Sequence, residues 1–217
     1  MKPELFIFDL DGTLVNSLAD LTWSVNTALQ ERGLEPYHEE EIRMMVGNGI
    51  RKLIERSLNG RGFHNGEEID NILKSFTKIY REHCLDRTLP YHNIKQTLLD
   101  LKGKGIKIAV LSNKADEMAK HIVTSLFGKS FFDLVRGMAD GMPAKPEPSS
   151  ALWICSSLGV LPASCCMVGD SGVDIQTAHR AGLFSIGVTW GFRSREELEQ
   201  SGAQCVVDKP EQLLQFV

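Results

Sequence analysis

The sequence predicts an α/β fold, a doubly wound parallel sheet into which an all-helical cap domain is inserted. Short runs are apolar at every position, which is typical of parallel strands covered on both faces. After residue 93, segments of helical period alternate with these runs. Finally, 98 residues separate Thr13 from Ser112, far more than one crossover helix and its turns need.

The apolar runs and the periodic segments give the expected elements of the core. The expected strands span residues 5–9, 106–112, 132–135, 165–168, 184–188 and 205–207. The expected helices span residues 94–104, 116–126, 149–158, 174–181 and 196–201. In the first of these helices Ile94, Leu98 and Leu101 share one face, as a helix packed on a sheet requires.

The long stretch after Thr13 has helical patterns of its own. They span residues 18–32, which end at Gly33, then 49–58 and 67–85. We therefore expect residues 17–88 to form the helical cap, and residues 1–16 with 89–217 to form the α/β core.

Composition limits the classes of partner. The formal net charge is -4, so there is no basic excess to attract nucleic acid or a membrane surface. No apolar run approaches the roughly 20 residues of a membrane-spanning helix, and the N-terminus lacks the pattern of a signal peptide. The five cysteines are odd in number without C-x-x-C spacing, and Cys165 and Cys166 lie in an apolar run typical of buried, reduced thiols. We expect a cytoplasmic monomer or homodimer.

The first strand ends in a motif with two carboxylates, Asp9-Leu10-Asp11-Gly12-Thr13. Ligands bind at this end of the strands in open α/β sheets. Asp9 can serve as nucleophile and metal ligand, and Asp11 as general acid and then general base. Gly12 lets the chain turn sharply. A plain Asp-Gly turn is the alternative that this motif alone leaves open.

Two further motifs supply hydrogen-bond donors and a positively charged side chain. Ser112 and Asn113 follow the second strand and can donate hydrogen bonds to phosphoryl oxygens, although both are also favoured helix N-caps. Lys145 opens the segment Lys145-Pro146-Glu147-Pro148 and can pair with Asp9 and with a phosphoryl group. The alternative for Lys145 is a solvated surface lysine.

The fourth motif, residues 169–174, follows another strand and carries Asp170 and Asp174. Asp170 as a helix N-cap would explain one of these carboxylates but not both. Asp9, Asp11, Asp170 and Asp174 would then meet at one sheet edge, where carboxylates about 4 Å apart repel by roughly 4 kcal/mol. Such a cluster needs a cation. Because its ligands are all oxygens, we expect Mg²⁺ and a phosphoryl-transfer site.

Together the motifs D-L-D-G-T at residues 9–13, S-N at 112–113, Lys145 in K-P-E-P, and G-D-S-x-x-D at 169–174 resemble those of the haloacid dehalogenase-like phosphatase superfamily. The resemblance covers essentially the whole chain. It implies a Rossmann-like core, Mg²⁺ and a catalytic aspartyl-phosphate. The position of the expected cap matches the first cap class of that superfamily.

Within the superfamily the sequence looks most like phosphoglycolate phosphatases. The features that it shares with them are residues 112–114, 46–49 and 189–192. The turn of Gly47, Asn48 and Gly49 precedes a helix, so its backbone N–H groups and Arg51 are expected to bind the substrate, which this resemblance makes 2-phosphoglycolate. A simple turn between two helices is the alternative at this place.

Other activities with the same chemistry stay open. They are hydrolysis of pyrophosphate, nucleotides or sugar phosphates. A phosphomutase would keep both aspartates of the first motif, whereas a dehalogenase has no need of the acid that Asp11 supplies. A non-catalytic binding protein is disfavoured because Asp9 and Asp170 are both present.

Overall fold

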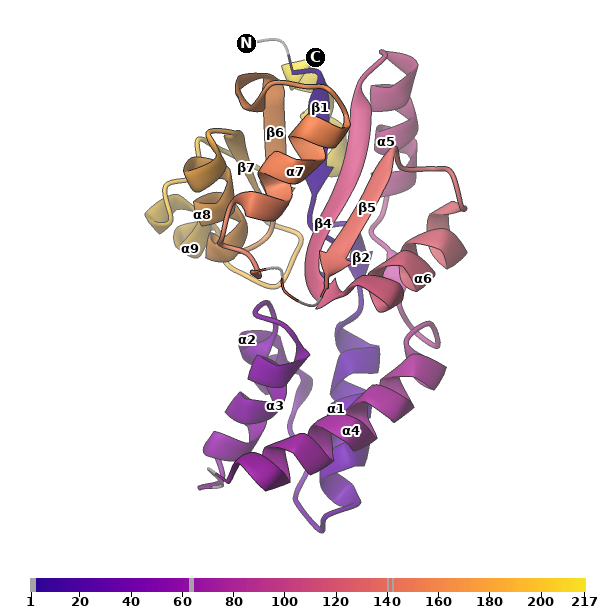
Figure 1. Ribbon diagram of the computed structural model, residues 1–217, viewed down its shortest axis with the longest axis vertical. Coiled ribbons are helices and arrows are strands. Elements are labelled where there is room, and N and C mark those ends of the chain that lie inside the picture. The colour runs from indigo at the N-terminus through magenta and orange to yellow at the C-terminus, as the bar shows by residue number, and fades with distance from the viewer. Residues whose placement is uncertain (1–2, 63–64, 140, 142) are drawn as a thin grey trace. The chain divides into compact units, whose positions relative to one another are not determined.

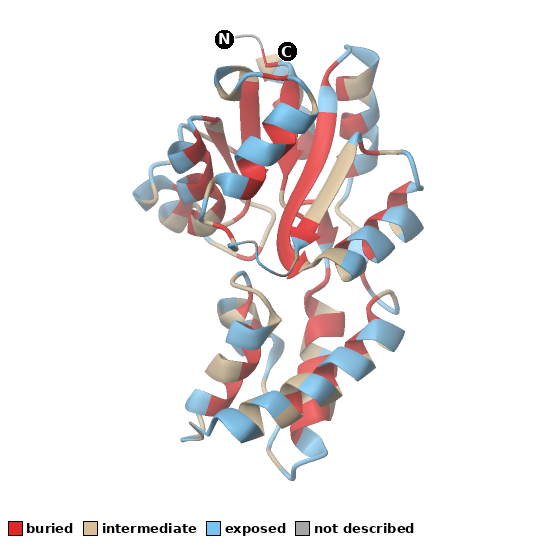
Figure 2. Cartoon of the chain, in the orientation of Figure 1, coloured by how far each residue is buried: buried red, intermediate tan, exposed pale blue. Residues whose placement is uncertain are grey.

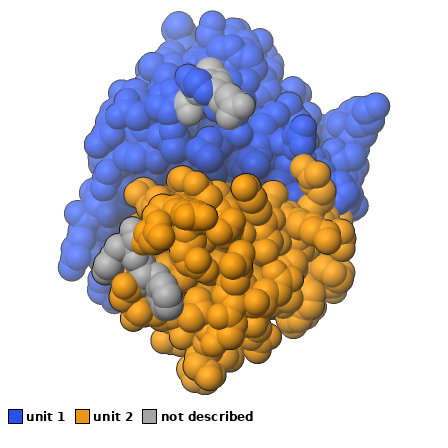
Figure 3. Space-filling model, turned by 60° about the horizontal axis from the view of Figure 1, so that its bottom comes forward, with its two compact units in different colours: residues 1–15, 90–217 blue, residues 16–89 orange. Residues whose placement is uncertain are grey.

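The computed structural model describes residues 3–62, 65–139, 141 and 143–217. Contacts divide the chain into two compact units, shown in two colours in Figure 3. Unit 1 consists of residues 1–15 and 90–217, and unit 2 of residues 16–89. Unit 1 is therefore built from two separate stretches of chain, and unit 2 from one.

A parallel sheet forms the centre of unit 1. In the described part of the chain it has six strands, in the order β5-β4-β1-β6-β7-β8 (Figure 1). Their bounds are β1 Leu5–Phe8, β4 Lys107–Ala115, β5 Leu134–Met138, β6 Cys165–Gly169, β7 Phe184–Val188 and β8 Cys205–Val207. The register places Phe8 beside Val110 on one side and Val168 on the other. All the carboxyl ends therefore meet at one edge, and β1 lies between the two strands that carry the other motifs.

Helices follow the strands as expected for a doubly wound α/β fold. They are α5 Ile94–Gly103, α6 Asp116–Phe127, α7 Ser149–Ser157, α8 Gly172–Ala181 and α9 Arg195–Gln200, with short 3-10 segments η1 Pro162–Ser164 and η2 Pro210–Phe216. In the view of Figure 1, α7 lies in front of the sheet and α5 behind it. The central strands are buried along their length, whereas the edge strand β5 is half-buried (Figure 2). The predicted fold class is confirmed.

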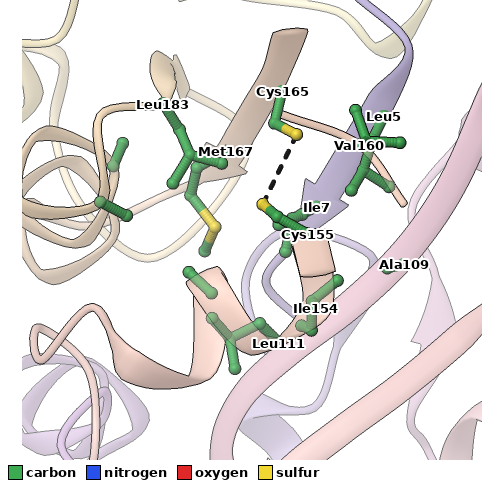
Figure 4. Close-up of a cluster of buried hydrophobic side chains, with 13 residues drawn as sticks. Leu5, Ile7, Ala109, Leu111, Ile154, Cys155, Val160, Cys165, Met167 and Leu183 are labelled. Atoms are coloured by element: carbon green, nitrogen blue, oxygen red, sulfur yellow. Dashed lines mark hydrogen bonds between the residues drawn. The ribbon is translucent and has the colours of Figure 1, made fainter. Parts of the chain in front are cut away.

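A cluster of apolar side chains joins α7 to the sheet (Figure 4). In it the Sγ atoms of Cys155 and Cys165 lie 3.5 Å apart, and both residues are free thiols. Burial raises the pKa of the neighbouring Cys166 to about 12, which keeps this thiol protonated. The expected buried, reduced thiols at Cys165 and Cys166 are confirmed.

The strand β4 runs three residues further than predicted and includes Ser112, Asn113 and Lys114. Its pairing with β5 shifts register between Leu111 and Ala115. The two strands are close here because Gly137 has no side chain; a Cβ on it would lie 2.6 Å from the carbonyl oxygen of Lys114. A polar stretch therefore continues a strand whose apolar part alone could be recognised in the sequence.

Unit 2 is helical. It comprises α1 Leu18–Gln30, α2 Glu39–Met45, α3 Ile50–Asn59 and α4 Gly66–His83. The apolar faces of α1 and α3 pack on α4, which buries Ile72, Phe76 and Tyr80. The sequence did not predict α2, because it buries Ile42 alone and so has no apolar period. Two short strands, β2 Val15–Asn16 and β3 Leu89–Pro90, pair in a separate sheet.

Candidate active site

Asp9 directly follows the central strand. Its backbone N–H donates to the carbonyl oxygen of Val168 (2.9 Å), which continues the ladder between β1 and β6. Its side-chain Oδ1 accepts a hydrogen bond from the N–H of Leu10 (2.7 Å) and lies 2.8 Å from Nζ of Lys145. The N–H of Leu10 and the buried ammonium of Lys145 thus fix the direction of this carboxylate.

Lys145 is buried and paired, not solvated. Its Nζ lies 2.8 Å from Oδ1 of Asp9 and 2.6 Å from Oδ1 of Asp174. Burial acts to lower the pKa of Lys145, but the charges of Asp174 and Asp9 outweigh burial and raise it. The side chain of Asn113 accepts from the N–H of Lys145 (2.8 Å) and donates to its carbonyl oxygen (3.1 Å). Asn113 therefore positions the loop that carries the lysine.

Asp170 and Asp174 meet Asp9 at the same sheet edge. One carboxylate oxygen from each of these residues lies within 4.8 Å of the others. Burial raises the pKa of Asp170 to about 8, and the charges of Asp174 and Asp9 add to the rise. Burial likewise raises the pKa of Asp9 to about 7, although Lys145 opposes it. The raised values show how unfavourable several buried negative charges are beside one ammonium.

This donor set fits a divalent cation. The ligand atoms are carboxylate oxygens, which hard ions such as Mg²⁺ prefer. A cation held by Asp9, Asp170 and Asp174 would supply the positive charge that Lys145 alone does not. The structure therefore supports a metal site at this edge of the sheet.

Close packing around Asp170 explains two glycines of the motifs. Gly12 has φ +85°, and a Cβ on it would lie 2.3 Å from Oδ2 of Asp170. A Cβ on Gly191 would lie 2.3 Å from Cβ of Asp170. The same carboxylate accepts hydrogen bonds from the N–H of Phe192 (2.8 Å) and from Oγ1 of Thr13 (3.2 Å). Side chains at these two glycine positions would displace Asp170.

The interpretation of Asp170 as a helix cap is wrong. The N-cap of α8 is Ser171, whose N–H and hydroxyl both donate to Oδ2 of Asp174 (3.2 and 2.7 Å). Asp174 is thereby oriented by the helix start, and its other oxygen faces Lys145. The helix-cap interpretation of Ser112 and Asn113 is also wrong, because both lie within β4 and α6 begins only at Asp116.

The surroundings of Asp11 differ from those of Asp9, Asp170 and Asp174. Its carboxylate is not part of the cluster but lies 2.8 and 3.0 Å from Nζ of Lys114, whose side chain is 3% exposed. Ser112 accepts from the N–H of Lys114 (3.2 Å), so its hydroxyl hydrogen can still be donated. A metal contact of Asp11 remains a prediction.

The sequence alone does not reveal the parts played by Lys114 and by residues 189–192. Lys114 stands in the sequence only as part of a family motif, since no local pattern indicates that β4 extends to it. Nε1 of Trp190 donates to the carbonyl oxygen of Thr13 (2.9 Å), and Phe192 holds Asp170. These contacts depend on tertiary structure and leave no local pattern.

The remaining candidates lie in unit 2. Gly47 (φ +118°) and Gly49 (φ +84°) form the expected turn, with Gly49 as the N-cap of α3. Arg56 stabilises the turn by donating to Oδ1 of Asn48 and to the carbonyl oxygen of Met45, both at 2.6 Å. Arg51 is half-exposed and pairs with Asp70 (2.7 Å). Substrate contacts of the turn and of Arg51 remain predictions.

Comparison with known proteins assigns the class. The family model for haloacid dehalogenase-like hydrolases matches residues 6–188. The chain therefore belongs to the haloacid dehalogenase-like hydrolase family and is an enzyme. Within the described residues, no helix is both long and apolar enough to span a membrane.

Relatives that match over nearly the whole length of the chain allow a more specific comparison. A phosphoglycolate phosphatase of Colwellia psychrerythraea is 33% identical, with 98% of this chain and 96% of that protein covered. A phosphoglycolate phosphatase of Haemophilus influenzae is 36% identical, with 97% and 96% covered. A solved structure from Lactobacillus delbrueckii subsp. bulgaricus matches with a TM-score of 0.93 at 33% identity, covering 98% of this chain and 97% of that one. The chain is thus a hydrolase of this family that is similar over its whole length to phosphoglycolate phosphatases.

Proposed function

We propose that this enzyme hydrolyses 2-phosphoglycolate through an aspartyl-phosphate on Asp9. The observation that carries the proposal is the fixed carboxylate of Asp9 at the end of the central strand. Lys145 holds it, and Asp170 and Asp174 lie beside it. The full-length similarity to phosphoglycolate phosphatases supports the choice of substrate.

The chemistry follows from the positions of two carboxylates. In the described part of the chain, Leu10 and Lys145 both contact Oδ1 of Asp9, so we assign the attack on phosphorus to Oδ2. As Oδ2 bonds to phosphorus, the bond to the ester oxygen breaks, and Asp11, which must carry a proton in the substrate complex, gives this proton to the ester oxygen. Asp11 then takes a proton from water, which attacks phosphorus and releases phosphate and free Asp9.

Other residues stabilise the transferred group. Lys145 and the hydroxyl of Ser112 would contact the phosphoryl oxygens, with Gly12, Thr13 and Asn113 shaping the same pocket. Mg²⁺ bound by Asp9, Asp170 and Asp174 would neutralise negative charge on the phosphoryl group and on the carboxylates.

The test is a panel of phosphorylated metabolites assayed with Mg²⁺. It contains 2-phosphoglycolate, pyrophosphate, nucleoside monophosphates and sugar phosphates, and it compares kcat/KM. We expect the highest value for 2-phosphoglycolate, and a phosphorylated Asp9 peptide after acid quenching. A higher value for another member of the panel would change the substrate. Conversion of one sugar phosphate into its isomer would indicate a mutase.

A further inference from the structure

We infer that Lys114 binds a carboxylate of the leaving group and so selects phosphate esters whose carboxylate lies close to the ester oxygen. This inference rests on the proposed function, because it uses Asp11 as the acid. It adds a residue of unit 1 to the substrate contacts that the sequence predicted for the turn of unit 2.

The ion pair between Lys114 and Asp11 carries the argument. Nζ of Lys114 lies 2.8 Å from one oxygen of Asp11 and 3.0 Å from the other. An acid can protonate the ester oxygen only within hydrogen-bond distance of it. The leaving group must therefore come beside Asp11, and with it beside the ammonium of Lys114.

The length of the substrate matches this distance. In 2-phosphoglycolate a single CH₂ separates the ester oxygen from the carboxylate carbon, so about 3 Å separates the ester and carboxylate oxygens. An ammonium has three donors and can bridge two carboxylates. Binding the substrate would exchange one of the two contacts between Lys114 and Asp11 for one with the substrate, while the other contact persists.

Burial makes this contact selective. The side chain of Lys114 is 3% exposed, so water competes poorly for its charge, and the attraction to a carboxylate is stronger than at the surface. A neutral leaving group of the same size could offer the buried ammonium only a neutral acceptor, such as a hydroxyl oxygen, which binds an ammonium more weakly than a carboxylate does. Arg51, by contrast, is 51% exposed, so solvent screens its charge, which makes it the weaker candidate.

The experiment compares two esters of similar size. They are 2-phosphoglycolate and 2-hydroxyethyl phosphate, which has two carbons but no carboxylate. For Lys114→Met we expect kcat/KM on 2-phosphoglycolate to fall about tenfold to a hundredfold further than on 2-hydroxyethyl phosphate. Lys114→Arg should recover part of the difference. The control Lys120→Met, in which an exposed lysine of α6 is replaced, should leave both values unchanged.

A series on the unmodified enzyme does not depend on the folding of any variant. The series contains esters with one, two or three CH₂ groups between the ester oxygen and the carboxylate. The value of kcat/KM should fall along this series as the carboxylate moves out of reach of Lys114. A flat series would overturn the inference. Equal losses of Lys114→Met on the two matched esters would also overturn it and leave Lys114 as a residue that only orients Asp11.

Two outcomes separate this inference from the function itself. A larger selective loss for Arg51→Met than for Lys114→Met would move the carboxylate contact to unit 2, while the proposed function stands. If the unmodified enzyme showed no preference for 2-phosphoglycolate in the metabolite panel, the proposed function would fail first, and this inference with it.

Discussion

Replacing Asp170 by Asn should stabilise the metal-free protein at alkaline pH. The side chain is buried beside Asp9 and Asp174, and burial raises its pKa to about 8. An asparagine has nearly the same shape and no charge. Its oxygen can accept from the N–H of Phe192, and its NH₂ can donate to the hydroxyl of Thr13, so both present contacts have a replacement.

The pKa gives the sign and size of the effect. Between about pH 4 and pH 8 the folded protein keeps a proton on Asp170 that the unfolded chain has released, so stability falls as pH rises through this range. Each tenfold change in proton affinity is worth about 1.4 kcal/mol, so a rise from 3.8 to about 8 gives a limit of about 6 kcal/mol. We expect about half of this, about 3 kcal/mol, because water can enter once the charge forms.

Chemical unfolding in chelator at pH 5.5 and pH 9 measures this difference. Trp190, which bonds to Thr13, gives a fluorescence signal from this part of unit 1. Asp170→Asn should gain about 3 kcal/mol over the unmodified protein at pH 9 but only about 1 kcal/mol at pH 5.5, which lies in the lower part of this pH range. Asp100→Asn, on α5, serves as control. Mg²⁺ should stabilise the unmodified protein, by about 2.7 kcal/mol at a hundred times its Kd, but hardly stabilise Asp170→Asn. If the unmodified protein in chelator is equally stable at both pH values, the assignment of a buried, uncompensated charge is wrong.

Three further substitutions test the remaining roles. Asp9→Asn should lower kcat at least about a thousandfold, because a neutral amide cannot attack phosphorus; turnover near that of the unmodified enzyme would exclude Asp9 as nucleophile. Asp11→Asn should slow esters with poor leaving groups about 10²–10⁴-fold and p-nitrophenyl phosphate much less; a loss independent of leaving-group pKa would exclude proton donation by Asp11. Gly49→Val puts a branched side chain at φ +84°, which costs about 1–3 kcal/mol of backbone strain. It should reduce kcat/KM on 2-phosphoglycolate about tenfold more than on p-nitrophenyl phosphate. Equal losses on the two substrates would mean that the role of the turn is purely structural.

Much of the fold could be predicted because its signals are local. The strands β7 and β8 have the predicted bounds, since each is an apolar run ended by polar or turn residues. Where polar residues continue a strand, the predicted strand ends before the observed one. The end of β4 at Ala115 depends on pairing with β5, and the approach of β5 depends on Gly137.

The residues of the candidate site likewise divide into those that a local sequence pattern reveals and those that only the folded structure reveals. Asp9 and Asp170 could be found because each follows an apolar strand and both stand in recognisable motifs. The partners that set their charge and direction could not be found by spacing. The pairing of Lys114 with Asp11 and the hydrogen bond from Phe192 to Asp170 join distant parts of the chain. They exist only once the sheet and its loops are assembled.

The discontinuous chain of unit 1 has a consequence for synthesis on the ribosome. Unit 2 is one continuous stretch, so its helices can pack as soon as residues 16–89 have emerged. The first strand emerges earlier still, but its neighbour β6 comes much later, and the hydrogen bond between Thr13 and Asp170 joins residues 157 positions apart. We therefore expect the nascent chain to carry a folded helical unit while the strand that precedes Asp9 is still unpaired on both sides, since β4 and β6 both emerge later. An activity that needs both Asp9 and Asp170 can begin only after most of the chain has been made.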